Sequence, residues 1–276
     1  MCCAGGDKPI DKIPIDNYGN AARALIGART AARDAAFFLE YLKPGMRLLD
    51  CGCGEGTITV GLAEVLSPGE VVGVDIASQS LQSAMQLATD RGLSNARFKE
   101  GNVYELPFPD ESFDAVFSHA LFEHLTDKSK ALTEIWRVLK TGGTVGLRAP
   151  DLGANIHEPY DPLIDQFWQL FVRIRDELGG ESKMGRRLVG LLRTAGYIDV
   201  KGSASFETYA TPDSVQWCAE LFGGFTLGPP YADEWLKRRW VDRETLEKIS
   251  TAWRAWAERE GAFGAYAWCE AVGWKA

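Results

Sequence analysis

The stretch LLDCGCGEGTIT, residues 48–59, decides how this chain is expected to fold. Apolar residues lead into Asp50, and glycines follow at positions 52, 54 and 56 before a helical pattern begins. Glycines permit positive φ angles and let a ligand approach the backbone closely. The start of the following helix leaves backbone N–H groups unpaired. The stretch therefore predicts a strand, a tight turn suited to a ligand, and a helix.

Apolar runs and helical patterns alternate around this turn. The apolar runs occupy residues 47–50, 71–75, 96–100, 115–118 and 144–149, and the helical patterns occupy 58–66, 80–92 and 128–139. Strands that alternate with helices form βαβ units, which build parallel sheets. We therefore expect an α/β fold with a parallel sheet wound on both faces.

The segments outside this alternation read as mostly helical. A helix is expected over residues 21–42, ended by Pro44 and Gly45. After Pro150 helical patterns cover 160–178, 186–195 and 211–260, whereas 197–209 and 262–274 read as strands. Most aromatic residues of the last third are expected in a core, with a minority facing a ligand; those considered are Phe167, Trp168, Phe171, Trp217, Phe222, Phe225, Tyr231 and Trp235.

Bulk properties exclude several classes of protein. The formal net charge is −8 and the basic residues are scattered, whereas nucleic-acid binders gather them on one face. No segment approaches the ~20 apolar residues of a membrane span, and the N-terminus lacks the features of a signal peptide. We expect a cytoplasmic protein with neither nucleic acid nor membrane as partner.

The cysteines indicate neither disulfides nor a metal site. Six cysteines in a cytosolic chain do not suggest a disulfide framework. Cys51 and Cys53 form a C-x-C pair, but no second pair accompanies them, as a metal site would require. We expect small turn residues here and no bound metal.

The spacing of the glycines separates two classes of ligand. The dinucleotide fingerprint is G-x-G-x-x-G, with a pyrophosphate at the helix N-terminus. Here the third glycine comes one residue early, and Asp50 would repel a pyrophosphate while suiting a ligand that carries an ammonium group. An NAD-dependent oxidoreductase is therefore disfavoured. A turn without any ligand stays open on this motif alone.

The turn resembles motif I of the class I S-adenosylmethionine-dependent methyltransferases, which carry an acid followed by glycines at alternate positions. Further motifs follow in the order of that family: VVGVDIAS at 71–78, EGNVYELPFPDESFDAVFSHALFEHL at 100–125 and TEIWRVLKTGGTVGLRAP at 133–150. The E-H-L of residues 123–125 is similar to the branch of ubiquinone and menaquinone biosynthesis. Thr141 stands where that branch usually has proline, and Gly142 is expected to stop the helix.

This resemblance implies a particular architecture. It is a Rossmann-like, doubly wound, seven-stranded sheet, mostly parallel with the last strand antiparallel, and with helical cap insertions. We expect a single domain over residues 1–276. Its parts are N-terminal lid helices (1–45), a cofactor-binding core (46–150) and helical caps for the substrate (151–196 and 210–261).

The resemblance also implies which residues bind the cofactor. Asp50 would face the aminoacyl end, and the carboxylate of Asp75 would accept hydrogen bonds from both ribose hydroxyls. Asn102 stands where the family often has Asp, and its amide oxygen can accept from the adenine amino group. The full implied set is Tyr18, Arg29, Asp50, Cys51, Gly52, Gly54, Asp75, Ile76, Gln79, Gly101, Asn102, Val103, His119 and Leu121.

The expected activity is transfer of a methyl group from S-adenosylmethionine, without metal, to an oxygen, carbon or nitrogen of a small, partly apolar metabolite. His119 is the catalytic candidate because the fourth strand ends at the cofactor methyl in this family. The carboxylates of Glu123 and Asp151 could also take a proton from the acceptor. The alternative is a protein of the same fold that binds the cofactor without transferring methyl. The acceptor and the oligomeric state stay open.

Overall fold

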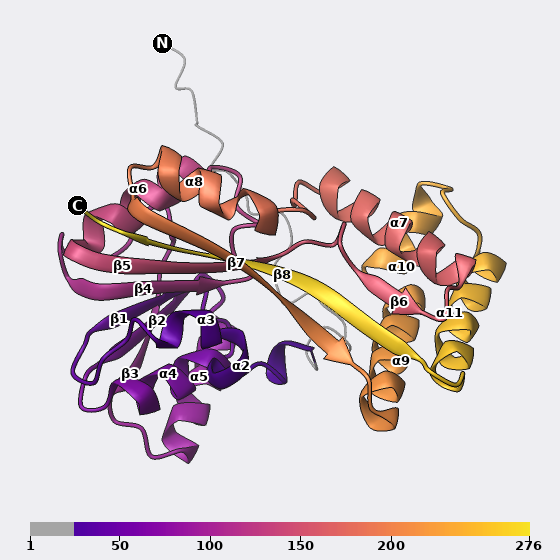
Figure 1. The fold of residues 1–276 in the computed structure, drawn as a ribbon, viewed down its shortest axis with the longest axis horizontal. Helices are drawn as coiled ribbons and strands as arrows, with labels where there is room; N and C mark the ends of the chain where they lie inside the picture. The colour runs from indigo at the N-terminus through magenta and orange to yellow at the C-terminus, as the bar shows by residue number, and fades with distance from the viewer. Residues whose placement is uncertain (1–24) are drawn as a thin grey trace, which may run out of the picture.

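The computed structural model describes residues 25–276, so the predicted contact Tyr18 lies outside the described residues. The described strands form one eight-stranded sheet in the order β3-β2-β1-β4-β5-β8 (Figure 1). The outer strand β7 pairs with β8, and the short strand β6 also pairs with β8. The predicted mostly parallel sheet is confirmed, and β6 adds one strand to the seven expected.

The first part of the sheet is parallel, and all of its strands except the edge strand are largely buried. Its strands are β1 (Leu48–Cys51), β2 (Val71–Asp75), β3 (Ala96–Glu100), β4 (Phe113–His119) and β5 (Leu139–Pro150). Every residue of β1 and β2 is buried, as is typical of parallel strands with helices on both sides. Successive residues of β1 pack into two different hydrophobic clusters: Leu48 belongs to one of them and Leu49 to a second.

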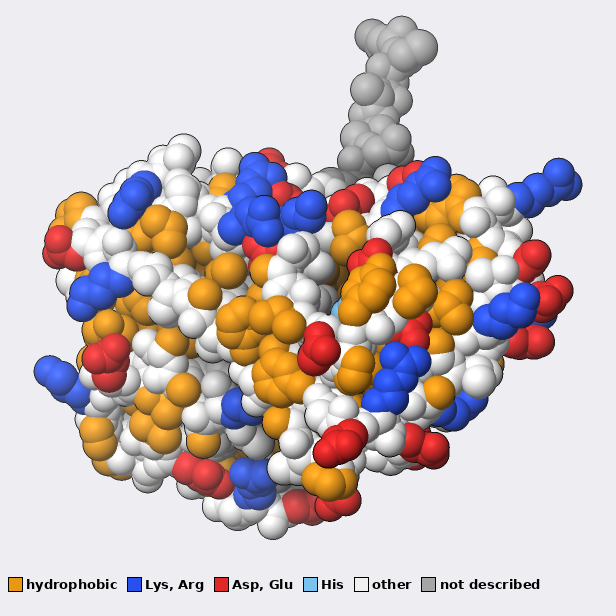
Figure 2. Space-filling model, turned by 45° about the vertical axis from the view of Figure 1, so that its right-hand side comes forward, with side chains coloured by type: hydrophobic (Ala, Val, Ile, Leu, Met, Phe, Trp, Pro, Cys, Tyr) orange, Lys and Arg blue, Asp and Glu red, His pale blue; other side chains and the backbone are white. Residues whose placement is uncertain are grey.

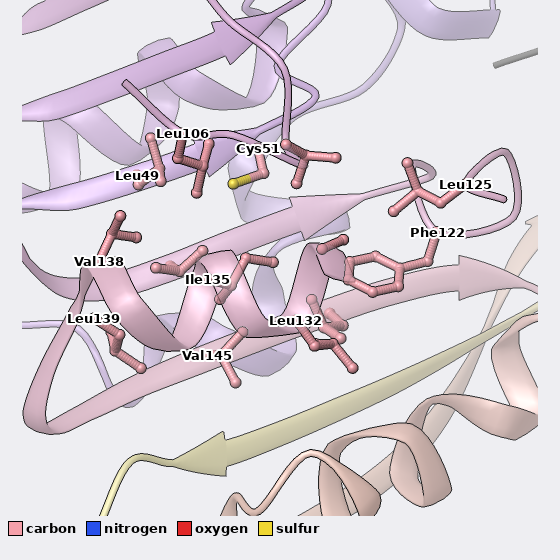
Figure 3. Close-up of a cluster of buried hydrophobic side chains, with 14 of the residues drawn as sticks. Leu49, Cys51, Leu106, Phe122, Leu125, Leu132, Ile135, Val138, Leu139 and Val145 are labelled. Carbon is pink, nitrogen blue, oxygen red and sulfur yellow. The ribbon is translucent and has the colours of Figure 1, made fainter. Parts of the chain in front are cut away.

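Helices cover both faces of this sheet. On one face lie α6 (Lys128–Val138) and α8 (Leu188–Thr194), and Figure 3 shows apolar side chains of α6 facing those of the sheet. On the other lie α4 (Thr57–Leu66), α2 (Ala31–Asp34) and α3 (Ala36–Leu39). The remaining helix, α5 (Ser78–Asp90), packs against β2 and β3. The doubly wound arrangement is therefore confirmed.

Two long antiparallel strands connect the sheet to a second group of helices. Strand β8 (Phe263–Trp274) lies between β5 and β7 (Ile198–Tyr209), and β6 (Ile156–Glu158) pairs with the beginning of β8. At ~3.3 Å per residue, twelve residues span about 40 Å. Both strands therefore extend beyond the parallel sheet toward the helices on the right of Figure 1. The last strand is antiparallel, as predicted.

The second group consists of α7 (Pro162–Glu177), α9 (Pro212–Leu227), α10 (Tyr231–Lys237) and α11 (Arg243–Ala257), which we call the cap helices. They share an aromatic core with residues of β7 and β8. The helical pattern expected over 211–260 is confirmed, and three helices occupy this range. Gly228-Pro229-Pro230 separates α9 from α10, since proline supplies no N–H for a helical hydrogen bond.

Two other segments differ from expectation. The continuous helix predicted up to residue 42 is broken in its described part, because Thr30 is extended and caps α2 by accepting from the Arg33 N–H. Helix α6 ends at Val138, before the glycines expected to stop it, and its C-cap Leu139 is already extended. Gly142, with φ of +77°, lies instead in an irregular part of β5. The side-chain pattern of these segments indicated that they are helical, but it did not indicate where each helix begins and ends.

Candidate active site

A cavity of about 470 Å³ lies between the carboxyl ends of the parallel strands and the cap helices. We call it the main cavity. Asp50, Asp75 and His119, from β1, β2 and β4, line one part of it. In open α/β sheets, ligands bind at the carboxyl ends of the strands. A side pocket of about 40 Å³ shares Ile76 and Leu121 with the main cavity.

The glycine turn brings backbone against both spaces. Gly52 has φ of +75°, and a Cβ there would lie 3.1 Å from Leu121, itself part of both linings. Gly56 has φ of +76°, and a Cβ there would lie 2.7 Å from the Cβ of Ala84 on α5. Only glycine adopts this conformation readily and leaves this space. Gly52 is thus required where the turn lines the cavity, and Gly56 is required where the turn packs against α5.

Asp50 is a buried carboxylate at the start of the turn. The Thr59 hydroxyl donates to its Oδ2 at 2.6 Å. Burial raises the pKa of Asp50 to about 7; the Thr59 hydrogen bond opposes this shift, and the nearby Asp75 adds to it. An ammonium group in the main cavity would favour the charged carboxylate. The site therefore fits the cationic aminoacyl end of the expected cofactor.

Asp75 is held rigidly at the end of β2. Gly54 N–H donates to its Oδ2 and Ala77 N–H donates to its Oδ1, both at 2.9 Å. Each carboxylate oxygen accepts two or more hydrogen bonds, so both keep capacity for a further donor. This geometry fits a ribose diol.

The predicted adenine contacts line the side pocket. Gly101, Asn102 and Val103 contribute to it together with Cys51 and Ile76. The side-chain oxygen of Asn102 accepts from Tyr104 N–H at 2.9 Å, which fixes the amide beside the pocket. Ile76 is 55% exposed. An apolar side chain with this exposure could pack against the flat face of a ligand.

His119 is buried at the end of β4 within a charged network. Its Nε2 lies 2.8 Å from Nη1 of Arg148, and its ring packs on Trp268 at 4.7 Å between centroids. Arg148 also donates to Asp34 at 2.9 Å and to Glu270 at 3.3 Å. Burial lowers the pKa of His119 well below its ordinary value, and the neighbouring arginines, chiefly Arg29 and Arg148, lower it further. His119 is therefore a neutral imidazole.

Of three further candidate residues, one lines the main cavity and two do not. Arg29 lines the main cavity, where its guanidinium lies 5.8 Å from the Trp268 ring. Gln79 is exposed on α5 and lines neither space. Asp151 is engaged by Arg186 through two hydrogen bonds of 2.5 and 2.7 Å and does not line the main cavity.

Aromatic side chains of the cap helices form the opposite wall. Trp168 and Phe171 come from α7, Phe222 and Phe225 from α9, and Tyr231 from α10. Five of the eight aromatics considered from the sequence thus line the main cavity. All eight also belong to the aromatic core of the cap or pack against it, as expected, and which of them face a ligand stays a prediction.

Sequence reasoning missed two charged residues of this lining, Arg175 and Glu207. Arg175 follows Trp168 and Phe171 at the i, i+3, i+7 spacing of one helix face, so periodicity was a usable signal. Glu207 lies on β7 and faces Arg33 at 3.5 Å. Its partner comes from a distant segment, so no local pattern indicated it.

Among residues 25–276, no group of three or more His, Cys, Asp or Glu side chains is placed to hold a metal ion. None of the helices in that range is both long and apolar enough to cross a bilayer.

Fold and site together define a class I methyltransferase: a doubly wound sheet with an antiparallel last strand, and a glycine turn and two carboxylates at its carboxyl edge. Comparison with known proteins agrees. The family described as "Methyltransferase domain" matches residues 42–169. A Schizosaccharomyces pombe protein described as an uncharacterized methyltransferase is 33% identical over 265 residues, covering 91% of this chain and 92% of the relative.

Two further matches cover part of the chain or show a shared fold. The demethylmenaquinone methyltransferase of Lactiplantibacillus plantarum is 36% identical over 133 residues, which are 48% of this chain and 54% of that protein. The structure of Haemonchus contortus phosphoethanolamine N-methyltransferase 2, in complex with phosphomonomethylethanolamine and S-adenosylhomocysteine, has a TM-score of 0.54 at 19% identity. The match covers 88% of this chain and 52% of that one. The chain therefore belongs to the S-adenosylmethionine-dependent methyltransferases.

Proposed function

We propose that this methyltransferase acts on a small, largely apolar and partly aromatic molecule bound under the cap helices. The observation that carries this proposal is the continuity of the main cavity. Asp50 and Asp75 line it on the sheet side, and aromatic rings of α7, α9 and α10 line it on the cap side. Largely apolar pockets with a few polar groups are typical of small-molecule sites.

The residues on the sheet side have a division of roles in this proposal. Asp50 binds the ammonium group of S-adenosylmethionine, Asp75 the ribose, and Asn102 with Val103 the adenine. The cofactor supplies an electrophilic methyl group on a cationic sulfur. The protein aligns the acceptor with that methyl and excludes water, and such positioning can contribute ~7–11 kcal/mol to lowering a barrier.

The acceptor is set by the cap in this proposal. The family match ends at residue 169, before α9 and α10 begin. The aromatic wall is thus built largely by segments outside the matched region. Trp168 Nε1 is buried and has no hydrogen-bond partner among residues 25–276, so a polar atom of the acceptor would satisfy it.

A macromolecular acceptor is not favoured. On the face drawn in Figure 2, basic side chains are interspersed with acidic and apolar ones. The net charge of −8 opposes binding to nucleic acid. We place the reaction in the cytoplasm and leave the oligomeric state open.

The test combines cofactor binding with an acceptor screen. Purified protein is first titrated with S-adenosylhomocysteine in a calorimeter and then incubated with methyl-labelled S-adenosylmethionine and a panel of small metabolites. We expect methylation of aromatic or otherwise apolar acceptors, and a Trp168→Ala variant with a raised KM for the acceptor alone. Methylation only of strongly polar acceptors, or an unaltered acceptor KM in the variant, would contradict the proposal.

A further inference from the structure

The hydrogen-bonding state of His119 follows from its neighbour. A guanidinium has only N–H donors and stays protonated in proteins. Arg148 Nη1 has two hydrogens: one points to Asp34 Oδ1 at 2.9 Å, and the other to His119 Nε2 at 2.8 Å. His119 Nε2 must therefore accept, and in a neutral imidazole the hydrogen then sits on Nδ1.

This state gives His119 a specific capacity. Its Nδ1 is buried without a hydrogen-bond partner among residues 25–276, although the residue lines the main cavity. A buried N–H without a partner is costly, at roughly 1–3 kcal/mol, unless a ligand or water accepts from it. An Nδ1 that already carries a hydrogen has no free lone pair for a proton, and the other ring nitrogen, Nε2, already accepts from Arg148. The charged groups around the ring also act on its protonation: Arg29, Arg33 and Arg148 disfavour an imidazolium, whereas the Asp34 carboxylate at 3.8 Å favours one.

Of three carboxylates that could take a proton near the cap, two are held by arginines. Glu207 pairs with Arg33 and Asp151 with Arg186. Glu123 lines the main cavity four residues after His119, and its Oε2 has no hydrogen-bond partner among the residues that the structure describes. Its Oε1 lies 3.8 Å from His124 Nε2, beyond hydrogen-bond distance. Burial raises the pKa of Glu123, although Arg175 and Arg29 partly oppose that shift.

We propose that His119 is a fixed hydrogen-bond donor to the methyl acceptor, and that the proton of an acceptor hydroxyl leaves to Glu123. Arg148 acts as the positioning residue that sets the His119 tautomer. This inference rests on the proposed function and assigns roles within the same site.

The step balances as follows. The acceptor O–H bond breaks and its proton passes to a Glu123 carboxylate oxygen. A lone pair of the acceptor oxygen forms the bond to the methyl carbon, while the carbon–sulfur bond breaks and leaves its electron pair on sulfur. Glu123 afterwards loses its proton to solvent. A carboxyl group with a raised pKa is better matched to this task than an ordinary one.

The first test needs no turnover. The protein has three histidines, so ¹⁵N-histidine spectra of the S-adenosylhomocysteine complex can be assigned with His124→Gln and His157→Gln variants. We expect a neutral His119 with protonated Nδ1 and bare Nε2 across pH 6–8. A protonated Nε2, or an imidazolium in this range, would overturn the inference.

The second test compares two amide variants on the hydroxyl acceptor that turns over fastest in the screen. Glu123→Gln should lower kcat by about 10²- to 10⁴-fold, the range of general-base contributions. It should also abolish the rise of kcat with pH. His119→Gln keeps an N–H donor and should mainly raise KM. Glu247→Gln, an exposed carboxylate on α11, is the matched control, and melting curves confirm that all variants fold.

The outcomes separate the hypotheses. A large kcat loss in His119→Gln with little change in Glu123→Gln would assign the base to His119 and refute the proposal. Methylation of carbon or amine acceptors alone, with Glu123→Gln at wild-type rate, would refute the role of Glu123. Cofactor binding with no methylated acceptor at all would contradict the proposed function, while the tautomer measurement still decides the role of His119.

Discussion

Cofactor affinity should depend on pH through Asp50, and the structure allows the size of this dependence to be worked out. Burial raises the pKa of this carboxyl to about 7 in the free protein. Only the ionised carboxylate attracts the ammonium group of the cofactor, and binding in turn holds the group ionised. The apparent Kd is then multiplied by one plus the ratio of protonated to ionised Asp50, so affinity is lost as pH falls below 7.

For a pKa of about 7, this factor is about 11 at pH 6.0 and about 1.3 at pH 7.5. The apparent Kd for S-adenosylhomocysteine should therefore be about eightfold weaker at pH 6.0. The difference corresponds to ~1.2 kcal/mol of binding free energy. Keeping the upper limit at pH 7.5 avoids the range in which α-amino groups themselves titrate, near pH 7.7–8.0.

Isothermal titration calorimetry at the two pH values measures this ratio, with two variants as controls. Asp50→Asn should bind weakly at both pH values with a ratio near one. Thr59→Val removes the hydrogen bond that opposes the pKa shift. It should therefore move the loss of affinity to higher pH. Equal affinities of the wild type at pH 6.0 and 7.5, or an eightfold ratio that persists in Asp50→Asn, would refute the reasoning.

Three further predictions concern packing and the acceptor. Gly56→Ala should lower the free energy of unfolding by roughly 1–3 kcal/mol in denaturant titrations, because φ is +76° and the new Cβ would meet Ala84 at 2.7 Å; an unchanged midpoint would contradict this. Trp168→Ala should raise the acceptor KM while leaving the affinity for S-adenosylhomocysteine within twofold of wild type, as kinetics and calorimetry can check; equal losses for both ligands would place Trp168 elsewhere. Arg148→Met leaves the buried Glu270 without its cation and Asp34 with Arg33 alone, and should destabilise the fold by ~3–5 kcal/mol, measured by thermal and denaturant unfolding. A loss below ~1 kcal/mol would show that the network is not an essential part of the core.

Asp50 also links function to stability. Its pKa rises from an ordinary 3.8 to about 7 on folding, so the native state holds more protons than the unfolded state between these values. Stability contributed by this group is present below pH ~4 and is lost as pH rises through 7, by up to ~4 kcal/mol in total. The protein therefore loses folding stability at neutral pH because Asp50, which is to bind a cation, is buried without one.

Much of the cofactor side of the site was predictable from local sequence. The acid and glycines of residues 50–56 and the acid at the end of the next strand lie in βα turns, where spacing along the chain sets position in space. Parallel strands then bring Asp50 and Asp75 to the same edge of the sheet. Gln79 shows the limit of this reasoning, because its side chain direction on α5 depends on helix phase and it lies outside both spaces.

The cap side was less predictable. The aromatic pattern of 211–260 indicated helices, but the break at Gly228 and the number of helices depend on how the segment folds back on α7 and α9. The pairing of Arg33 with Glu207 joins residues 174 positions apart, and no local pattern carries such a contact.

The amino-acid sequence by itself determined the class of this protein: strand–turn–helix periodicity and the spacing of Asp50, the glycines and Asp75 specify an S-adenosylmethionine-dependent methyltransferase. Only the tertiary structure decided the chemistry around His119. Its tautomer follows from Arg148, which lies on another strand 29 residues away, and its neutral state follows from burial among arginines. Hydrogen-bond roles and pKa values depend on the atoms that surround a group in space, and these come from segments that are distant along the chain.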